Sequence, residues 1–146
     1  MAWDENDLIP QTEITDKVTS KTVDFAKRFG AYLGENETKF DEKKKKDVVD
    51  RAKLTTSQLR KFFGEVKRQQ MSGYDETDFV LLKPKLAYAV GRAKDSKAKI
   101  NDFYKVISNA IDNVSNEAHF KNFIKVFEAI VAYHKAAEES KLSDNN

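Results

Sequence analysis

The sequence contains no cysteine, and only seven of its 146 residues are proline or glycine. Without cysteine the chain can form no disulfide framework, no thiolate metal cluster and no thiol nucleophile. Sheet-rich folds need many turn residues, so the scarcity of proline and glycine favours helices. No apolar run approaches the length of a signal-peptide core or a membrane span. We therefore expect a cytoplasmic protein with no membrane partner.

The composition is that of one globular domain: 40% of the residues are hydrophobic, 16 are aromatic and 34% are charged. A chain of this length is about the size of a single domain. We expect an all-α fold, a compact bundle of five to six mostly antiparallel helices. Residues 1–15 are expected to form a flexible N-terminal arm, which Trp3, Leu8 and Ile9 could fix to the body or to a neighbour. Residues 16–138 would form the bundle and residues 139–146 a disordered tail.

Helical periodicity is clear in several segments. A first helix is predicted from Thr15 or Asp16 to Leu33. A capping box of Thr55 and Gln58 predicts the start of the next well-defined helix. Three apolar series then have the spacing of helices that bury one face. They are Leu59, Phe62, Phe63 and Val66; Ile100, Phe103, Ile107, Ala110 and Ile111; and Phe120, Phe123, Ile124, Phe127 and Ile130.

Two segments allow more than one interpretation. The charge-dense stretch from Glu35 to Lys53 reads as a polar loop followed by a short helix over 47–53, or as a frayed helix. Around Pro84 the apolar series continues in phase, although proline removes a backbone donor and disfavours helix at the preceding residue. Either one helix kinks there, or a short helix ends and a second begins with proline in its first turn.

Charge is distributed unevenly along the chain, whose net charge is only +2. Residues 43–105 contain 17 Lys and Arg against 8 Asp and Glu, whereas the remaining residues contain 9 against 16. Because electric fields act locally, a basic centre between acidic ends points to a polyanionic partner. A solvated lysine-rich surface is the competing explanation.

Residues that could support catalysis are few. His119 and His134 are fifteen residues apart on one predicted helix, about 22 Å along its axis, so they cannot share a metal ion. Asp75, Glu76 and Asp78 could hold a divalent cation in a hydrolase, but acidic residues before an apolar helix more simply complement its dipole. We expect no enzymatic activity, no cofactor and no bound metal.

Two predicted helices carry basic residues beside their apolar faces. Arg60 and Lys67 border the face of the first, with Gly64 between them, and Lys61 and Arg68 lie farther out. A glycine would let a sugar-phosphate backbone approach closely while the flanking cations contact phosphates. The alternative is a glycine tolerated on an exposed surface among solubilising charges.

The second basic stripe consists of Lys85, Tyr88 and Arg92, with Lys83 on the opposite flank. We expect Tyr88 at the edge of the core, although a tyrosine can also stack on a base. Three further lysines could continue a track for one nucleic-acid strand: Lys94, Lys97 and Lys99. Two basic borders together favour nucleic-acid binding over a merely solvated surface.

Three segments in this order resemble the small subunit of type III-A CRISPR RNA-guided complexes, the Csm small-subunit family. They are "LTTSQLRKFFGEV", "LLKPKLAYAVGR" and "FKNFIKVFEAIVAYHK", and the similarity covers roughly residues 50–137. The resemblance implies a non-catalytic helical subunit, present in several copies, whose partners are guide RNA, target RNA, other subunits of the complex and copies of itself. It would contact RNA backbone and leave sequence recognition to base pairing.

The resemblance assigns RNA contacts to residues within the matching segments: Arg60, Lys61, Lys83, Lys85 and Arg92. Helix geometry extends this set to Lys53, Lys67 and Arg68. The alternative is a helical protein-protein adaptor whose charges only keep it soluble, with no nucleic-acid contact. The lysine run 43–46 lies outside the similar segments and receives no role from the resemblance.

Overall fold

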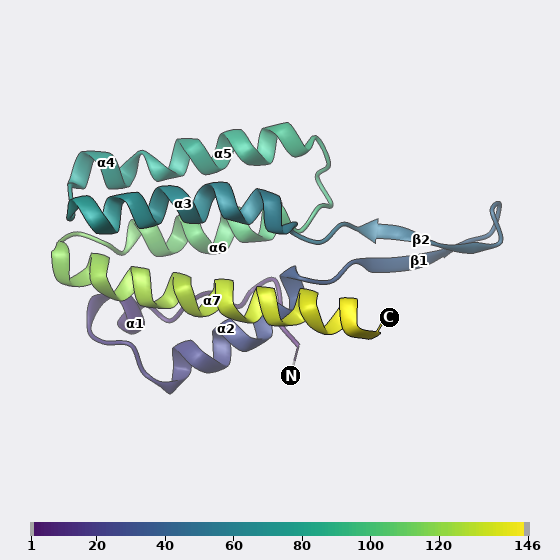
Figure 1. The fold of residues 1–146 in the computed structure, drawn as a ribbon, viewed down its shortest axis with the longest axis horizontal. Helices are drawn as coiled ribbons and strands as arrows, with labels where there is room; N and C mark the ends of the chain where they lie inside the picture. Colours follow the sequence, from purple (N-terminus) through teal and green to yellow (C-terminus); the bar gives the residue numbers. More distant parts are fainter. Residues whose placement is uncertain (1, 145–146) are drawn as a thin grey trace.

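The computed structural model describes residues 2–144, and of residues 140–144 it describes only the backbone. Helices dominate, and one antiparallel pair of strands interrupts them (Figure 1). In chain order the elements are α1 (Gln11–Thr15), α2 (Ser20–Leu33), β1 (Glu37–Asp41), β2 (Lys46–Arg51), α3 (Thr56–Ser72), α4 (Glu76–Val80), α5 (Leu82–Ala93), α6 (Ile100–Asp112) and α7 (Glu117–Asp144). The expected helical fold is confirmed for most of the chain, and the all-α class is wrong for residues 37–51.

Helices α3 and α6 run away from the strand pair, whereas α4, α5 and α7 run toward it (Figure 1). Helix α3 lies between α5 and α7, and it contacts both. Helix α6 packs against α5, while α7 also packs against α1 and α2. One side of α3 therefore remains uncovered, and its two flanks face neighbouring helices.

Aromatic side chains fill the centre of the bundle. The ring of Phe127 on α7 contacts Phe62 of α3, Phe103 of α6 and Phe123 one turn earlier, with centroids 5.5 to 6.0 Å apart. All four residues are buried. The predicted apolar stripes of α3, α6 and α7 thus meet in one core, as their helical spacing requires.

Close packing fixes α2 against α7. A Cβ atom added to Gly30 would lie 2.6 Å from the Cβ of Tyr133, and one added to Gly34 would lie 2.9 Å from the Cβ of Ala137. These distances are shorter than side chains tolerate, so the two glycines allow the helix backbones to approach.

Local signals set the boundaries of α3 to α5. Thr55 and Gln58 form the predicted capping box at the start of α3. Asp75 caps α4 by accepting a hydrogen bond from the backbone N–H of Asp78. Pro84 is the third residue of α5, after a separate short helix has ended at Val80. The interpretation with a second helix that begins around the proline is confirmed.

The N-terminal segment packs onto the helical body. Trp3 and Ile9 are buried, and the Trp3 ring lies 4.9 Å from that of Phe29 and 4.7 Å from that of Tyr32. Helix α2 begins at Ser20, four residues after the predicted Asp16. At the other end of the chain, α7 continues through Asp144, so residues 139–144 of the expected tail are helical; residues 145–146 lie outside the described residues.

The late start of α2 has a physical cause in Glu13. Its buried carboxylate accepts hydrogen bonds from the backbone N–H and hydroxyl groups of Thr19 and Thr22, at 2.8 to 3.0 Å. Burial raises the pKa of Glu13, but these four donors outweigh it and hold the pKa below its usual value. The Glu13 carboxylate therefore caps the start of α2 although it lies outside this helix. The chain between Glu13 and Thr19 must turn to bring the carboxylate to the first residues of α2.

Residues 37–51 form a β-hairpin, so both predicted interpretations, a polar loop followed by a short helix over 47–53 and a frayed helix, are wrong. Asp41 accepts hydrogen bonds from the backbone N–H groups of Lys43 and Lys44, and Lys45 adopts a left-handed conformation with φ of 56°. This turn reverses the chain and pairs Phe40 with Asp47. A lysine in place of the usual glycine or asparagine conceals the turn in the sequence.

Candidate nucleic-acid interface

A groove of about 560 Å³ separates α3 from α5. Cations from both helices line it: Lys61 from α3, and Lys85 and Arg92 from α5. Tyr88 lies between the two cations of α5 and is 69% exposed, so its expected place at the edge of the core is wrong. Its spacing from Lys85 and Arg92, three and four residues, places all three on one side of α5. The groove thus brings together Lys61 and the cations Lys85 and Arg92, which come from segments distant in the sequence.

One carboxylate lies among these cations. Glu65 accepts hydrogen bonds from Lys85 Nζ and Arg68 Nη2, each at 2.7 Å. The Arg68 guanidinium is the largest cause that lowers the pKa of Glu65, to about 2, and Lys85 adds to it. Arg68 also pairs with Asp78 at 2.9 Å. Glu65 is not among the residues predicted for the site, although its place three residues before Arg68 is the spacing of a helical ion pair.

The other flank of α3 faces α7. Arg60 lines a second groove there, together with His134 and Lys135 of α7. Lys67 on the same flank pairs with Glu128 at 3.2 Å and lies 5.4 Å from the centre of the Phe63 ring. Arg60 and Lys67 are therefore divided from Lys85 and Arg92 by α3 itself, and the predicted cations form two rows rather than one.

Other predicted cations are paired with carboxylates or buried. Lys83 pairs with Asp112 of α6 at 2.6 Å, and Lys53 pairs with Glu138 of α7 at 3.5 Å. The expected extension of the track through Lys99 is wrong, because that side chain is buried with an exposed fraction of 2%. Lys97, also expected on the track, pairs with Asp50 of the hairpin at 3.2 Å.

Three of the eight predicted cations make no ion pair within the part of the chain that the structure describes: Arg60, Lys61 and Arg92. Arg60 and Lys61 are exposed on the uncovered side of α3, with Gly64 one turn further along. A Cβ atom added to Gly64 would meet no atom within 4 Å. Internal packing therefore does not require a glycine at this position.

The candidate catalytic residues have structural partners. His134 is buried, and its Nε2 lies 2.7 Å from the backbone oxygen of Leu54, as expected for a histidine of the core. His119 accepts a hydrogen bond from the backbone N–H of Ser115 at the start of α7. Among the described residues, no three His, Asp or Glu side chains gather closely enough to hold a metal ion. Between residues 2 and 144, no helix combines the length and the apolarity needed to cross a membrane.

The structure defines a small, mostly helical protein with basic residues on both flanks of α3, a helix that leaves one side uncovered. The family model described as Csm2 Type III-A matches residues 38–140. This match covers more than two thirds of the chain, which therefore belongs to the Csm2 family. No curated protein and no solved structure matches the chain.

Membership of this family implies a subunit of a type III-A CRISPR effector complex that assembles with other subunits of the complex. The match begins within β1 and extends to α7. It thus includes the hairpin and both grooves beside α3, whereas α1 and α2 lie outside it.

Proposed function

We propose that the chain is a non-catalytic, RNA-binding structural subunit of a cytoplasmic type III-A CRISPR ribonucleoprotein. It contacts the backbone of the guide or target RNA without sequence specificity and supports binding of the target. The observation that carries this proposal is the groove between α3 and α5, where Lys61 and Arg92 face a common space beside the exposed Tyr88. Neither cation has a carboxylate partner among the described residues, so both can serve phosphates.

The RNA strand would follow the uncovered side of α3. Lys61, Arg68, Lys85 and Arg92 contact it from the α5 side, and Arg60 and Lys67 contact it from the α7 side. Lys53 and Lys83 lie at the periphery and contribute through their charge. Cations on helix surfaces bind phosphates of any sequence, which suits a complex whose guide RNA supplies specificity.

Carboxylates next to the cations limit the affinity of one copy. Glu65 and Glu128 pair with Lys85 and Lys67, so a phosphate must compete for these lysines. Several copies in one assembly, each with a few contacts, would bind the same RNA much more tightly than one copy alone. The proposal therefore includes copies of this chain among its partners, and its experiments use the assembled complex.

The central test replaces Lys61 and Arg92 with alanine and measures RNA binding by the complex assembled with its partner subunits and a guide RNA. A matched control replaces Lys21 and Lys27, two exposed lysines of α2, which removes the same charge elsewhere. The groove variant should bind target RNA more weakly, and by the same factor for unrelated guide and target pairs. The slope of log affinity against log salt should fall by about 0.7 for each lost phosphate contact. An unchanged RNA affinity and an unchanged salt slope would favour the alternative function, a protein-protein adaptor. A loss of affinity confined to one RNA sequence would exclude recognition of the RNA backbone.

A further inference from the structure

The β-hairpin projects away from the helical body, so that only its base lies near the helices (Figure 1). Residues 37–40 of β1 are all exposed, and so is the turn that follows Asp41. A strand of five residues extends about 17 Å, which sets the reach of the turn. Two-stranded hairpins without a packed face are marginal in water, so this hairpin needs support at its base.

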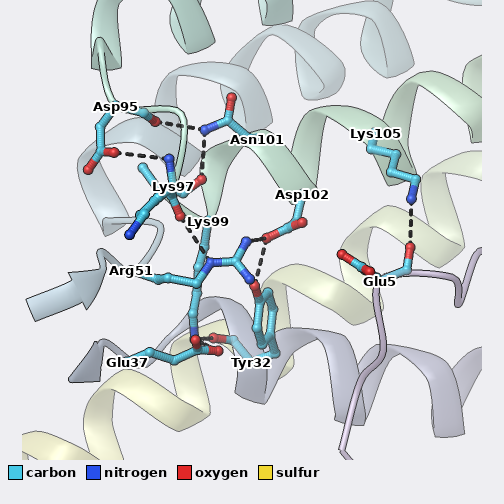
Figure 2. A network of polar contacts seen from close by, with 11 residues as sticks. Glu5, Tyr32, Glu37, Arg51, Asp95, Lys97, Lys99, Asn101, Asp102 and Lys105 are labelled. Atoms are coloured by element: carbon cyan, nitrogen blue, oxygen red, sulfur yellow. Dashed lines mark hydrogen bonds and ion pairs between the residues drawn. The ribbon is translucent and has the colours of Figure 1, made fainter. Parts of the chain in front are cut away.

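A polar network provides that support (Figure 2). Arg51, the last residue of β2, donates hydrogen bonds from Nη2 to Asp102 Oδ2 at 2.7 Å and from Nε to the backbone oxygen of Lys97 at 3.1 Å. Tyr32 of α2 donates its hydroxyl hydrogen to the same Asp102 oxygen at 2.6 Å. The end of β2 is thereby joined to both α2 and α6.

The start of β1 is held by a buried lysine. Lys99 Nζ lies 3.6 Å from Glu37 Oε1, donates to the backbone oxygen of Tyr32 at 2.7 Å and lies 3.9 Å from the centre of the Tyr32 ring. The backbone N–H of Lys99 also donates to the oxygen of Ala52, just after β2. Both strands thus leave the body in a fixed direction, although the outer part of the hairpin buries little.

The outer part combines positive charge with an exposed aromatic ring. Lysines 43, 44 and 46 make no ion pair with any residue of the described chain, whereas Lys45 lies 4.0 Å from Glu42. Asp41 is engaged by the backbone of the turn, and Asp50 by Lys39 and Lys97. Phe40 and Val49 share one face of the hairpin, with exposed fractions of 55% and 53%.

We propose that this hairpin is a second RNA-binding element, in which Lys43, Lys44 and Lys46 contact phosphates and Phe40 stacks on an unpaired base. The proposal rests on the RNA-binding function proposed above. Single-stranded RNA is bound by this pairing of cations with an exposed aromatic ring, and the ring accepts any base. The fixed base of the hairpin lowers the entropy lost on binding, because its direction is already set.

The experiment compares two changes in the assembled complex and uses a fluorescent target RNA that pairs with only part of the guide. The tip variant, K43A/K44A/K46A, removes the three cations and leaves Lys45, whose left-handed backbone forms the turn. Its salt slope should be smaller by up to about 2, at about 0.7 for each of three contacts. Phe40→Ala should lower the affinity at least about fivefold and leave the slope unchanged, because stacking releases no counterions.

The control K17A/K21A/K27A removes three exposed lysines from α2 and the turn before it. If the tip variant binds like this control, the hairpin does not contact RNA, and the proposal fails. The proposed function still stands in that case if the variant of Lys61 and Arg92 loses affinity. Native mass spectrometry supplies the other decisive outcome: a tip variant that no longer enters the complex would show that the hairpin docks on a protein subunit instead.

Discussion

Replacing Gly64 by alanine separates the stability of α3 from its proposed contact with RNA. Gly64 lies in the interior of α3, on the exposed side, and an added Cβ would meet no atom within 4 Å. Alanine is favoured over glycine in a helix interior by about 1 kcal/mol, and no clash offsets this gain here. The variant should therefore be more stable by about 1 kcal/mol, which raises the melting temperature by about 3 °C for a chain of this size.

The same methyl group should weaken RNA binding. Arg60, Lys61 and Gly64 lie together on the uncovered side of α3, where a phosphodiester backbone would approach the glycine most closely. A Cβ at this position pushes the phosphates away from the two cations. If one hydrogen bond to a charged group is lost, the affinity falls about tenfold, which corresponds to about 1.4 kcal/mol.

The assay combines thermal unfolding of the isolated chain with RNA titration of the assembled complex. Gly91→Ala is the matched control, because an added Cβ there also meets no atom and Gly91 does not line the groove between α3 and α5. Both variants should unfold at a higher temperature, and only Gly64→Ala should lose affinity. A Gly64→Ala variant that binds RNA as tightly as the unchanged chain would refute an approach of RNA to this side of α3.

The other predictions concern charge and packing. Glu65→Gln should raise RNA affinity and steepen its salt dependence in titrations, because it releases Lys85 for phosphate binding. Glu65→Gln should also lower the free energy of unfolding at pH 7 by about 1 kcal/mol, measured in urea. Folding lowers the pKa of Glu65 from 4.5 to about 2. The stability difference between the two proteins should therefore be complete above pH 4.5 and vanish as the pH approaches 2. The pKa of Glu13 is also lowered on folding. Glu13→Gln should therefore be less stable than the unchanged chain at neutral pH, and this difference should disappear in acid. Gly30→Ala should lower the unfolding temperature, because its Cβ would overlap Tyr133, and an unchanged temperature would contradict the packing of α2 on α7.

The helices that the sequence predicted well are those whose signals are local. The capping box of α3 uses residues three apart, and Pro84 restricts only its own turn of α5. The stripes of α6 and α7 follow from periodicity because each buries one side against a single core. Such features depend on neighbours in the sequence, so no tertiary information was needed to find them.

The features that could not be predicted depend on distant residues. Arg51 and Asp102 support the hairpin from positions 51 residues apart, and the charge-dense strands carry too few apolar residues to show alternation. The predicted cations could be placed on helix faces, but their partners could not: Lys83 meets Asp112 and Lys67 meets Glu128 only after the helices pack. Folding thus decides which cations stay unpaired, and a single sequence does not contain this information in a local form.

The pairing of cations with carboxylates bears directly on how such a subunit could distinguish its own assembly from other RNA. A helix face of unpaired lysines and arginines would bind any RNA in the cell, because phosphate contacts carry no sequence information. In this chain Lys61 and Arg92 line the groove without a carboxylate partner among the described residues, while Glu65 pairs with Lys85. Under the proposed function each copy would have few contacts to offer alone, and binding would become strong only where several copies follow one RNA. The ion pairs beside α3 are therefore compatible with the proposed RNA binding, because they would make that binding depend on the assembly.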